Sequence, residues 1–180
     1  MTRTLYIIGS AAPPVRQLDE ACALARTHGW EPCIILTPLA AGWVDLEMLR
    51  AATSQPIRTV PRRPDEQDPL PKADAVLAAP LTFNTINKWA AGISDNLALG
   101  LLNELLVAGP PIVAAPCAKK ALRAHPTYGP SLHTLEAVGV TIVDQDAVVE
   151  RGLDGLAAFR WHDVLGVLDA RAARPRRHTG

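Results

Sequence analysis

Small hydroxyl and amide side chains follow a short apolar run, Ala75 to Ala79. The run predicts a buried strand, and Pro80 is expected to end it before a long helical pattern begins. Thr82, Asn84 and Thr85 would then stand between the carboxyl end of a strand and the amino end of a helix. Hydroxyls and amides in that place suit a phosphate group or the polar edge of a ring. The sequence therefore predicts a ligand-binding turn here.

Similar polar or small residues follow other apolar runs of the chain. Gly9 and Ser10 come after the run Leu5 to Ile8, and Thr37 ends the next apolar run. A later run is followed by the segment Pro116 to Lys120. Because ligands of parallel sheets bind outside the carboxyl ends of the strands, we expect these loops to converge on one site.

The elements that must position these residues alternate between strand and helix patterns. Strands are predicted at 5–8, 32–37, 57–60, 75–79, 111–115 and 140–143, and helices at 15–25, 46–52, 84–107 with a break near Gly92, and 131–138. Unbroken apolar strands of this kind predict a mostly parallel sheet that helices cover on both faces. The expected fold is a single-domain, doubly wound α/β fold of the flavodoxin or Rossmann type, with about six strands.

Length and composition limit the class of protein. A chain of 180 residues is sufficient for one α/β domain, which we expect at 1–170, with a basic, disordered tail at 171–180. The residues from Pro61 to Pro71 are too rich in proline and charge for regular structure and predict a loop.

The charge pattern and the cysteines argue against several kinds of partner. The 18 basic and 18 acidic residues give no net charge, which disfavours binding to nucleic acid or to an anionic membrane. No signal peptide or membrane-spanning segment is apparent, so we expect a cytoplasmic protein. The spacing of Cys22, Cys33 and Cys117 fits neither a metal site nor a disulfide framework.

These residues together resemble the flavin-containing cysteine decarboxylases, which include phosphopantothenoylcysteine decarboxylase and the decarboxylases of lantibiotic biosynthesis. The resemblance covers roughly residues 4–168. Gly9 to Ala12 is similar to the loop of that family that receives the FMN phosphate, and Pro80 to Thr85 is similar to its Pro-Ala-Ser-Ala-Asn-Thr motif. Thr37, with Trp43 six residues later, matches a hydroxyl residue followed by an aromatic beside the flavin.

The resemblance implies FMN as the cofactor. The residues that it places at the flavin are Gly9, Ser10, Ala11, Thr37, Trp43, Pro80, Thr82, Asn84 and Thr85. It also implies a homotrimer or a multiple of trimers, with the flavin at a subunit boundary, and flavin-dependent oxidation and decarboxylation of a small or peptidyl substrate that carries a thiol and a carboxylate.

The positions that handle the substrate differ from those of the family. Glu66 stands where the family has a catalytic histidine, and Lys119 replaces the asparagine of a Pro-x-Met-Asn motif that binds the substrate carboxylate. Glu150 stands where phosphopantothenoylcysteine decarboxylases carry a reducing cysteine. We therefore take Glu66, Lys119 and His125 as candidate catalytic residues, with His125 as a replacement base beside the altered motif.

Three further interpretations of the sequence remain open. The first is a non-catalytic flavoprotein that acts as an interaction or regulatory partner, and the others are a flavin prenyltransferase and a nucleotide-binding protein without flavin. Cys117 could be a small apolar side chain at a strand end, or a thiol whose pKa is lowered by Lys119 and Lys120.

Overall fold

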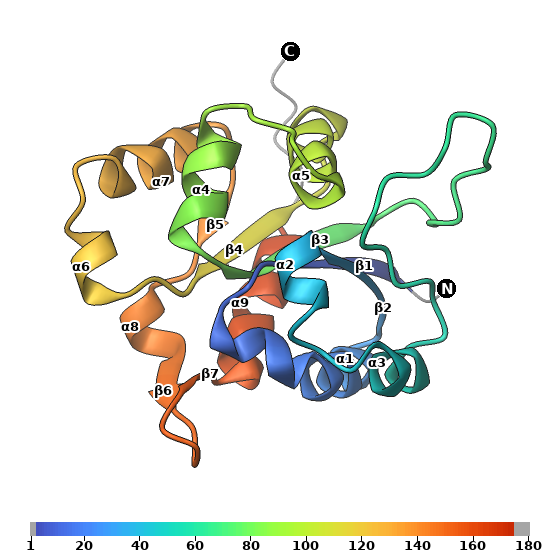
Figure 1. Ribbon diagram of the computed structural model, residues 1–180, viewed down its shortest axis with the longest axis horizontal. Coiled ribbons are helices and arrows are strands. Elements are labelled where there is room, and N and C mark those ends of the chain that lie inside the picture. Colours follow the sequence, from blue (N-terminus) through green and yellow to red (C-terminus); the bar gives the residue numbers. More distant parts are fainter. Residues whose placement is uncertain (1–2, 175–180) are drawn as a thin grey trace.

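Five parallel strands form the central sheet of the computed structural model, which describes residues 3–174 (Figure 1). Their spatial order is β2-β1-β3-β4-β5, with bounds Arg3–Gly9 for β1, Trp30–Leu36 for β2, Ala75–Leu81 for β3, Ile112–Pro116 for β4 and Thr141–Ile142 for β5. The chain leaves β1 toward β2 on one side and reaches β3 on the other. The order therefore reverses between β1 and β3, which is where a doubly wound sheet opens a crevice for ligands.

Helices cover both faces of this sheet, as the sequence predicts. The helices are the 3-10 helix η1 (Pro13–Gln17), α1 (Leu18–Thr27), α2 (Pro38–Ala41), α3 (Leu46–Ala52), α4 (Phe83–Ala90), α5 (Leu97–Ala108), α6 (Lys120–Arg123), α7 (Tyr128–Ala137), α8 (Gln145–Val148) and α9 (Trp161–Ala172). A two-stranded antiparallel hairpin, β6 (Val149–Arg151) and β7 (Ala157–Phe159), lies between α8 and α9.

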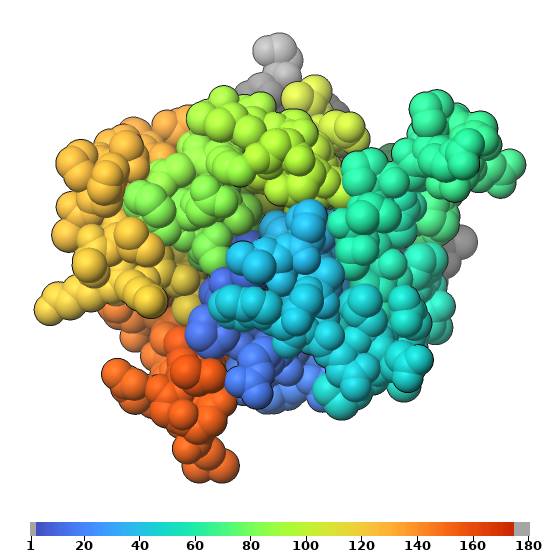
Figure 2. Space-filling view, in the orientation of Figure 1, coloured from blue at the N-terminus to red at the C-terminus, as the bar shows by residue number. Residues whose placement is uncertain are grey.

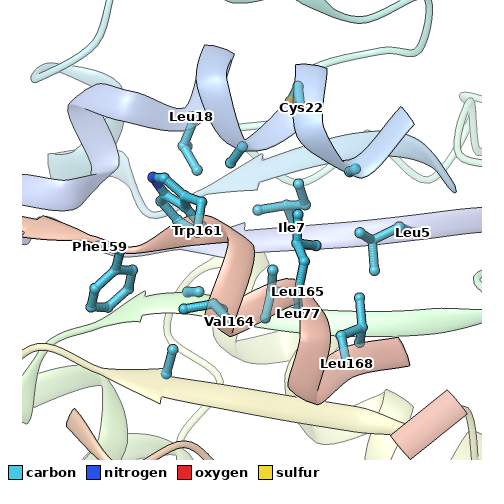
Figure 3. Close-up of a cluster of buried hydrophobic side chains, with 14 of the residues drawn as sticks. Leu5, Ile7, Leu18, Cys22, Leu77, Phe159, Trp161, Val164, Leu165 and Leu168 are labelled. Atoms are coloured by element: carbon cyan, nitrogen blue, oxygen red, sulfur yellow. The ribbon is translucent and has the colours of Figure 1, made fainter. Parts of the chain in front are cut away.

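The strands supply alternate residues to two separate cores. Leu5 and Ile7 of β1 belong to one cluster with α1 and α9, whereas Tyr6 and Ile8 belong to a second cluster with α4, α5 and α7. Figure 3 shows the first cluster, in which Trp161 lies between α1 and the sheet. Both faces of the sheet are buried, which is why the central parts of its strands are continuously apolar, with polar residues such as Arg3 and Glu31 near the strand starts.

One predicted strand is wrong. Residues 57–60 form no strand, and only an isolated bridge joins Arg58 to Ile35 at the outer edge of β2. The Arg58 N–H donates to the Ile34 carbonyl at 2.9 Å, and the Leu36 N–H donates to the Arg58 carbonyl at 2.9 Å. Pro56 and Pro61 flank the segment and supply no N–H, so the pairing does not extend. The sheet consequently has five strands where about six were expected.

The C-terminal part contains more structure than the sequence analysis predicts. Helix α9 packs Trp161, Val164, Leu165 and Leu168 into the first core, and it extends through Ala172. The spacing of these residues is a helical pattern that could have been found in the sequence. The first two residues of the expected tail, 171 and 172, are therefore helical, and its residues 175–180 lie outside the described residues.

The predicted break in the long helical region is present. It separates α4 from α5, and the side chain of Asn96 caps α5 by accepting the Leu99 N–H at 3.1 Å. The neighbouring Asp95 pairs with Lys88. Among residues 3–174, no helix is long and apolar enough to cross a membrane.

Gly9 allows close packing at the end of β1. A Cβ atom there would lie 3.2 Å from Leu36 Cδ2 and 3.4 Å from the Ala79 carbonyl oxygen. We predict that Gly9→Val lowers the free energy of unfolding by about 1–3 kcal/mol through overpacking, measured by urea denaturation. The control Gly100→Ala has no heavy atom within 4 Å of the new Cβ. It should leave stability unchanged or raise it, and equal losses in both variants would contradict the packing argument.

Candidate functional site

A cavity of about 860 Å³ lies at the carboxyl end of the sheet. Its lining comes from the segment after β1, from the start of α4, from the segment after β4 and from the β6–β7 hairpin. The lining residues are Ala11, Ala12, Pro13, Trp43, Thr82, Phe83, Asn84, Cys117, Ala118, Lys119, Leu122, Gln145, Val149, Glu150, Arg151, Gly155, Leu156 and Ala157. In Figure 2 the blue segment after β1 lies between green α4 and the orange hairpin, on the face turned to the reader.

The hydroxyl of Ser10 joins β1 to β3 behind this cavity. It donates to the Pro80 carbonyl at 2.9 Å and accepts the Thr82 N–H at 2.8 Å, and the Ser10 N–H also donates to the Pro80 carbonyl. Ser10 is 1% exposed. Its hydroxyl is therefore used within the protein at the point where the strand order reverses.

The other predicted hydroxyls also have partners within the chain. Thr37 begins α2 by accepting the Ala40 N–H at 3.3 Å, and the Thr82 hydroxyl accepts the Thr85 N–H at 3.2 Å. The hydroxyls of Thr82 and Thr85 are 3.0 Å apart. Of these three residues only Thr82 lines the cavity. The side chains of Thr37 and Thr85 are buried and stabilise the two turns through hydrogen bonds on the side away from the cavity.

Four of the residues predicted to bind a cofactor line the cavity directly: Ala11, Trp43, Thr82 and Asn84. The Ala11 N–H and the Asn84 side-chain amide have no hydrogen-bond partner within residues 3–174. In the first turn of α4 the N–H groups of Phe83 and Asn84 also have no intrahelical partner, whereas the Thr85 N–H is capped by Thr82. This wall therefore offers donors for an anion beside apolar and aromatic surface.

Gly9 and Pro80, which were also predicted to bind the cofactor, lie behind the wall. Gly9 accepts the Thr37 N–H at 3.0 Å through its carbonyl, and Pro80 accepts the Ser10 bonds described above. Both are buried and neither lines the cavity. Gly9 and Pro80 therefore stabilise the loops around the cavity through their backbone carbonyls.

Lys119 lines the opposite wall and is exposed. Within residues 3–174 no carboxylate lies within ion-pair distance of its ammonium group. Among the same residues, no cationic side chain lies within ion-pair distance of the Glu150 carboxylate. The Arg151 guanidinium donates to the Gly155 carbonyl at 2.8 Å across the hairpin turn. Lys119 is consequently a cation available to an anionic ligand.

His125 lies next to the wall without lining the cavity. Its ring packs edge-on against Phe83, with the ring centroids 5.4 Å apart, and Phe83 lines the cavity. The His125 Nδ1 lies 2.9 Å from the Thr127 hydroxyl oxygen and 3.2 Å from the Thr127 backbone nitrogen, so this ring nitrogen is engaged within its own loop. Nε2 is the ring nitrogen left for a ligand.

Glu66 lies apart from the other candidates. It belongs to the exposed loop of residues 61–71, where its carboxylate accepts the Arg63 N–H at 3.0 Å. The loop extends beyond β2, on the opposite side of the molecule from α6 and the hairpin (Figure 1). Within one chain, Glu66 is therefore not brought together with Lys119.

Cys117 does line the cavity, and of the two interpretations left open for it, the thiol with a lowered pKa is wrong. Burial raises the pKa of its thiol to about 11. Burial likewise raises the pKa of Cys22 and of Cys33 to about 12. The thiol of Cys117 is consequently neutral near pH 7.

Sequence analysis missed Gln145, which lines the cavity from α8. Its side-chain amide donates to the Ala118 carbonyl at 2.9 Å and accepts the Ala118 N–H at 2.9 Å. It also missed the hairpin, whose Leu156 and Ala157 complete the apolar lining. No motif marks Gln145, because its partner is backbone that lies 27 residues earlier.

The role of Ser10 can be tested through stability. We predict that Ser10→Ala lowers the free energy of unfolding by about 1–3 kcal/mol, because the Thr82 N–H loses its partner in a buried place. Urea denaturation measures this change. The exposed control Ser54→Ala, which loses one bond to Glu31, should change stability by less than about 0.5 kcal/mol. A Ser10 variant as stable as the wild type would rule out the joining role.

The raised pKa of Cys117 gives a pH dependence. Because the thiolate is the reactive form, alkylation of Cys117 should stay slow at pH 8 and accelerate as the pH approaches 11. Peptide mass mapping after iodoacetamide treatment measures this rate. Cys22 and Cys33 are fully buried, so they should react only on unfolding. A midpoint near pH 8.5 for Cys117 would show that its environment is wrongly described.

The fold is shared with several solved structures. An FMN-dependent cysteine decarboxylase from thioviridamide biosynthesis, TvaF, superposes with a TM-score of 0.74 at 23% identity, over 97% of this chain and 100% of that one. A PPC decarboxylase mutant complexed with pantothenoylaminoethenethiol gives 0.73 at 16% identity, over 94% and 98%. The FMN-binding protein AtHal3 gives 0.71 at 17% identity, over 94% and 96%. At these identities the likeness establishes the fold.

Sequence comparison gives the family. A cysteine/cysteine sulfinic acid decarboxylase from an unknown prokaryotic organism is 40% identical over 72 residues, which are 40% of this chain and 19% of that protein. The match thus spans about a fifth of that relative. The model of the Flavoprotein family matches residues 15–173, nearly the whole chain. This protein belongs to the Flavoprotein family.

Proposed function

We propose that this chain binds FMN in the cavity at the β1/β3 crevice and uses it to oxidise and decarboxylate a small or peptidyl substrate that carries a thiol and a carboxylate. The observation that carries the proposal is a mainly apolar cavity with unpartnered N–H donors at the point where the strand order reverses. Membership of the Flavoprotein family supports the flavin. The decarboxylase relatives support the class of reaction.

The residues of the cavity fit FMN in size and chemistry. A volume of about 860 Å³ falls in the range of about 300–1,000 Å³ that is usual for small-molecule sites. Trp43 and Phe83 offer aromatic faces to a flat ring, and Trp43 is 45% exposed at the rim. The Ala11 N–H and the amino end of α4 would hold the phosphate. Asn84 would face a polar edge of the ring.

The buried hydroxyls have an indirect part in this proposal. Ser10, Thr37 and Thr85 already bond to the protein, so they would hold the turns that present the N–H groups. Bound FMN would supply the two-electron acceptor that oxidises the thiol-bearing carbon of the substrate to a thioaldehyde. The thioaldehyde would then release carbon dioxide. An external acceptor such as dioxygen would take up the two electrons.

Lys119 would bind the substrate carboxylate. A cation stabilises the carboxylate before carbon dioxide leaves. The contact would therefore orient the substrate, but it would also oppose the loss of negative charge from the carboxylate during decarboxylation. Cys117, with its neutral thiol, would be an apolar neighbour of the substrate. His125 could donate through Nε2 to sulfur that gains negative charge.

A homotrimer, or a multiple of trimers, completes the proposal. The 61–71 loop lies on the side of the molecule away from α6 and the hairpin (Figure 1), and a subunit boundary at the cavity would let this loop of a second copy approach. Leu39 of α2, Trp43 and Met48 of α3 are exposed apolar side chains from one stretch of the chain, and Trp43 lines the cavity, which supports such a contact.

A non-catalytic flavoprotein that serves as an interaction partner is the second candidate function. One observation favours it: the cavity lining contains no histidine from residues 3–174 to serve as a catalytic base. Catalysis is therefore the part of the proposal that needs the most direct test.

The purified protein should show the visible absorbance of oxidised flavin, as isolated or after addition of FMN. Incubation with cysteine-terminated peptides and with phosphopantothenoylcysteine should then give products lighter by carbon dioxide and two hydrogens, detected by mass spectrometry. A protein that remains colourless with FMN would refute the flavin site. A yellow protein that changes neither substrate and co-purifies with another flavoprotein would support the interaction role.

Two variants at one position test where the phosphate and ring lie. Asn84→Asp should weaken FMN binding at least tenfold, because a carboxylate replaces a donor beside an anion, whereas Asn84→Ala should weaken it less. Fluorescence titration of FMN measures both. A carboxylate in the first turn of α4 favours the helix, so loss of fold does not explain the effect. Undiminished binding by Asn84→Asp would contradict the placement.

A further inference from the structure

Helix α8 holds the segment after β4 at two points. The Gln145 side chain makes two hydrogen bonds to the backbone of Ala118, each 2.9 Å long. The next residue, Asp146, pairs with both terminal nitrogens of Arg123 at 2.6 and 2.8 Å. Two adjacent side chains of α8 therefore fix the start and the end of one short segment.

These two attachments enclose Lys119. Ala118 immediately precedes Lys119, and Arg123 lies four residues after it, at the end of α6. Lys119 begins α6 with extended backbone angles, φ −61° and ψ 147°, and no side chain caps that helix. A four-residue helix is weak by itself. The direction of the Lys119 side chain consequently depends on the contacts from α8.

The two attachments differ in strength. Ala118 is 7% exposed, so loss of Gln145 leaves its N–H and carbonyl without partners in a nearly dry place. The Asp146 side chain is 68% exposed, and solvent screens its pairing with Arg123. Gln145 should therefore control the segment more strongly than Asp146 does.

We propose that Gln145 and Asp146 are positioning residues that hold Lys119 at the cavity wall and thereby set the preference of the site for a carboxylate-bearing ligand. This proposal rests on the proposed function, since it assumes that Lys119 meets the substrate carboxylate. The β6–β7 hairpin begins directly after α8. The same helix therefore fixes Lys119 and starts the hairpin that forms the adjoining wall.

The contact between Gln145 and Ala118 can be tested without FMN and without turnover. Cys117 precedes Ala118 and is half-buried, whereas the other two cysteines are fully buried. Its alkylation rate therefore reports opening of this segment. Gln145→Ala should raise the rate about tenfold, and Asp146→Asn about two- to threefold. The control Glu31→Gln breaks a partly exposed ion pair between β2 and Arg26 of α1, which does not touch α8, and should leave the rate unchanged.

A pair of ligands that differ only in a carboxylate tests whether Gln145 acts on ligand binding through Lys119. N-acetylserine and N-acetylserinamide form such a pair, and their hydroxyl replaces the thiol that a flavin could oxidise. The wild-type protein, as purified, should bind the acid about tenfold more tightly than the amide, by calorimetry. Lys119→Met should abolish this preference, and Gln145→Ala should reduce it severalfold. In the double variant, Gln145→Ala should cause no further loss.

Each outcome separates this proposal from the proposed function. An unchanged alkylation rate in Gln145→Ala overturns the positioning role, whether or not FMN binds. Equal wild-type affinity for acid and amide, or a Gln145 effect that persists in Lys119→Met, overturns the link to the carboxylate. Absence of flavin binding or of decarboxylation, with the acid preference and its loss both observed, refutes the proposed reaction and leaves the positioning role standing.

Discussion

The buried hydroxyl of Ser10 is the contact on which the ligand side of the sheet depends. It connects β1 to the carbonyl of Pro80 and the N–H of Thr82, where the strand order reverses. Thr82 is also the residue that caps α4. The spacing of two strands and the starting point of a helix are thus set by one group. A displacement of β1 against β3 would move the amino end of α4 with it.

The cavity has two walls of different construction. The wall from β1, β3 and α4 is supported by buried hydroxyls and by the close approach of Gly9 to Leu36. The facing wall consists of α6, α8 and the hairpin, whose side chains are largely exposed, and side chains from α8 connect its parts. Local opening costs less where fewer apolar contacts are lost. The wall that would bind substrate is therefore the one able to adapt, while the wall that would bind the cofactor is rigid.

Sequence analysis could predict the first wall because local patterns determine it. Apolar runs followed by Gly9, Ser10 or Thr82 place small polar residues at strand ends, and parallel strands bring those ends together. It could not predict that the Ser10 hydroxyl is used internally, since a hydroxyl at a strand end suits a phosphate and a carbonyl equally. The role of Gln145 depends on a contact across 27 residues, and the high pKa of Cys117 depends on burial. Neither is visible in residue spacing.

Lys119 shows why the resemblance of the first wall to a known cofactor site does not determine the reaction. An amide in its place can donate to a carboxylate and lose that bond at little cost when the negative charge moves away. An ammonium group attracts the carboxylate most strongly while its negative charge is intact. That attraction is lost as carbon dioxide forms, so it raises the barrier to decarboxylation. A site built on Lys119 gains orientation and affinity at the expense of the decarboxylation step. Under the proposed function, such a site would favour substrates whose thioaldehyde loses carbon dioxide readily without help, because the protein would then need only to hold the carboxylate in place until oxidation is complete.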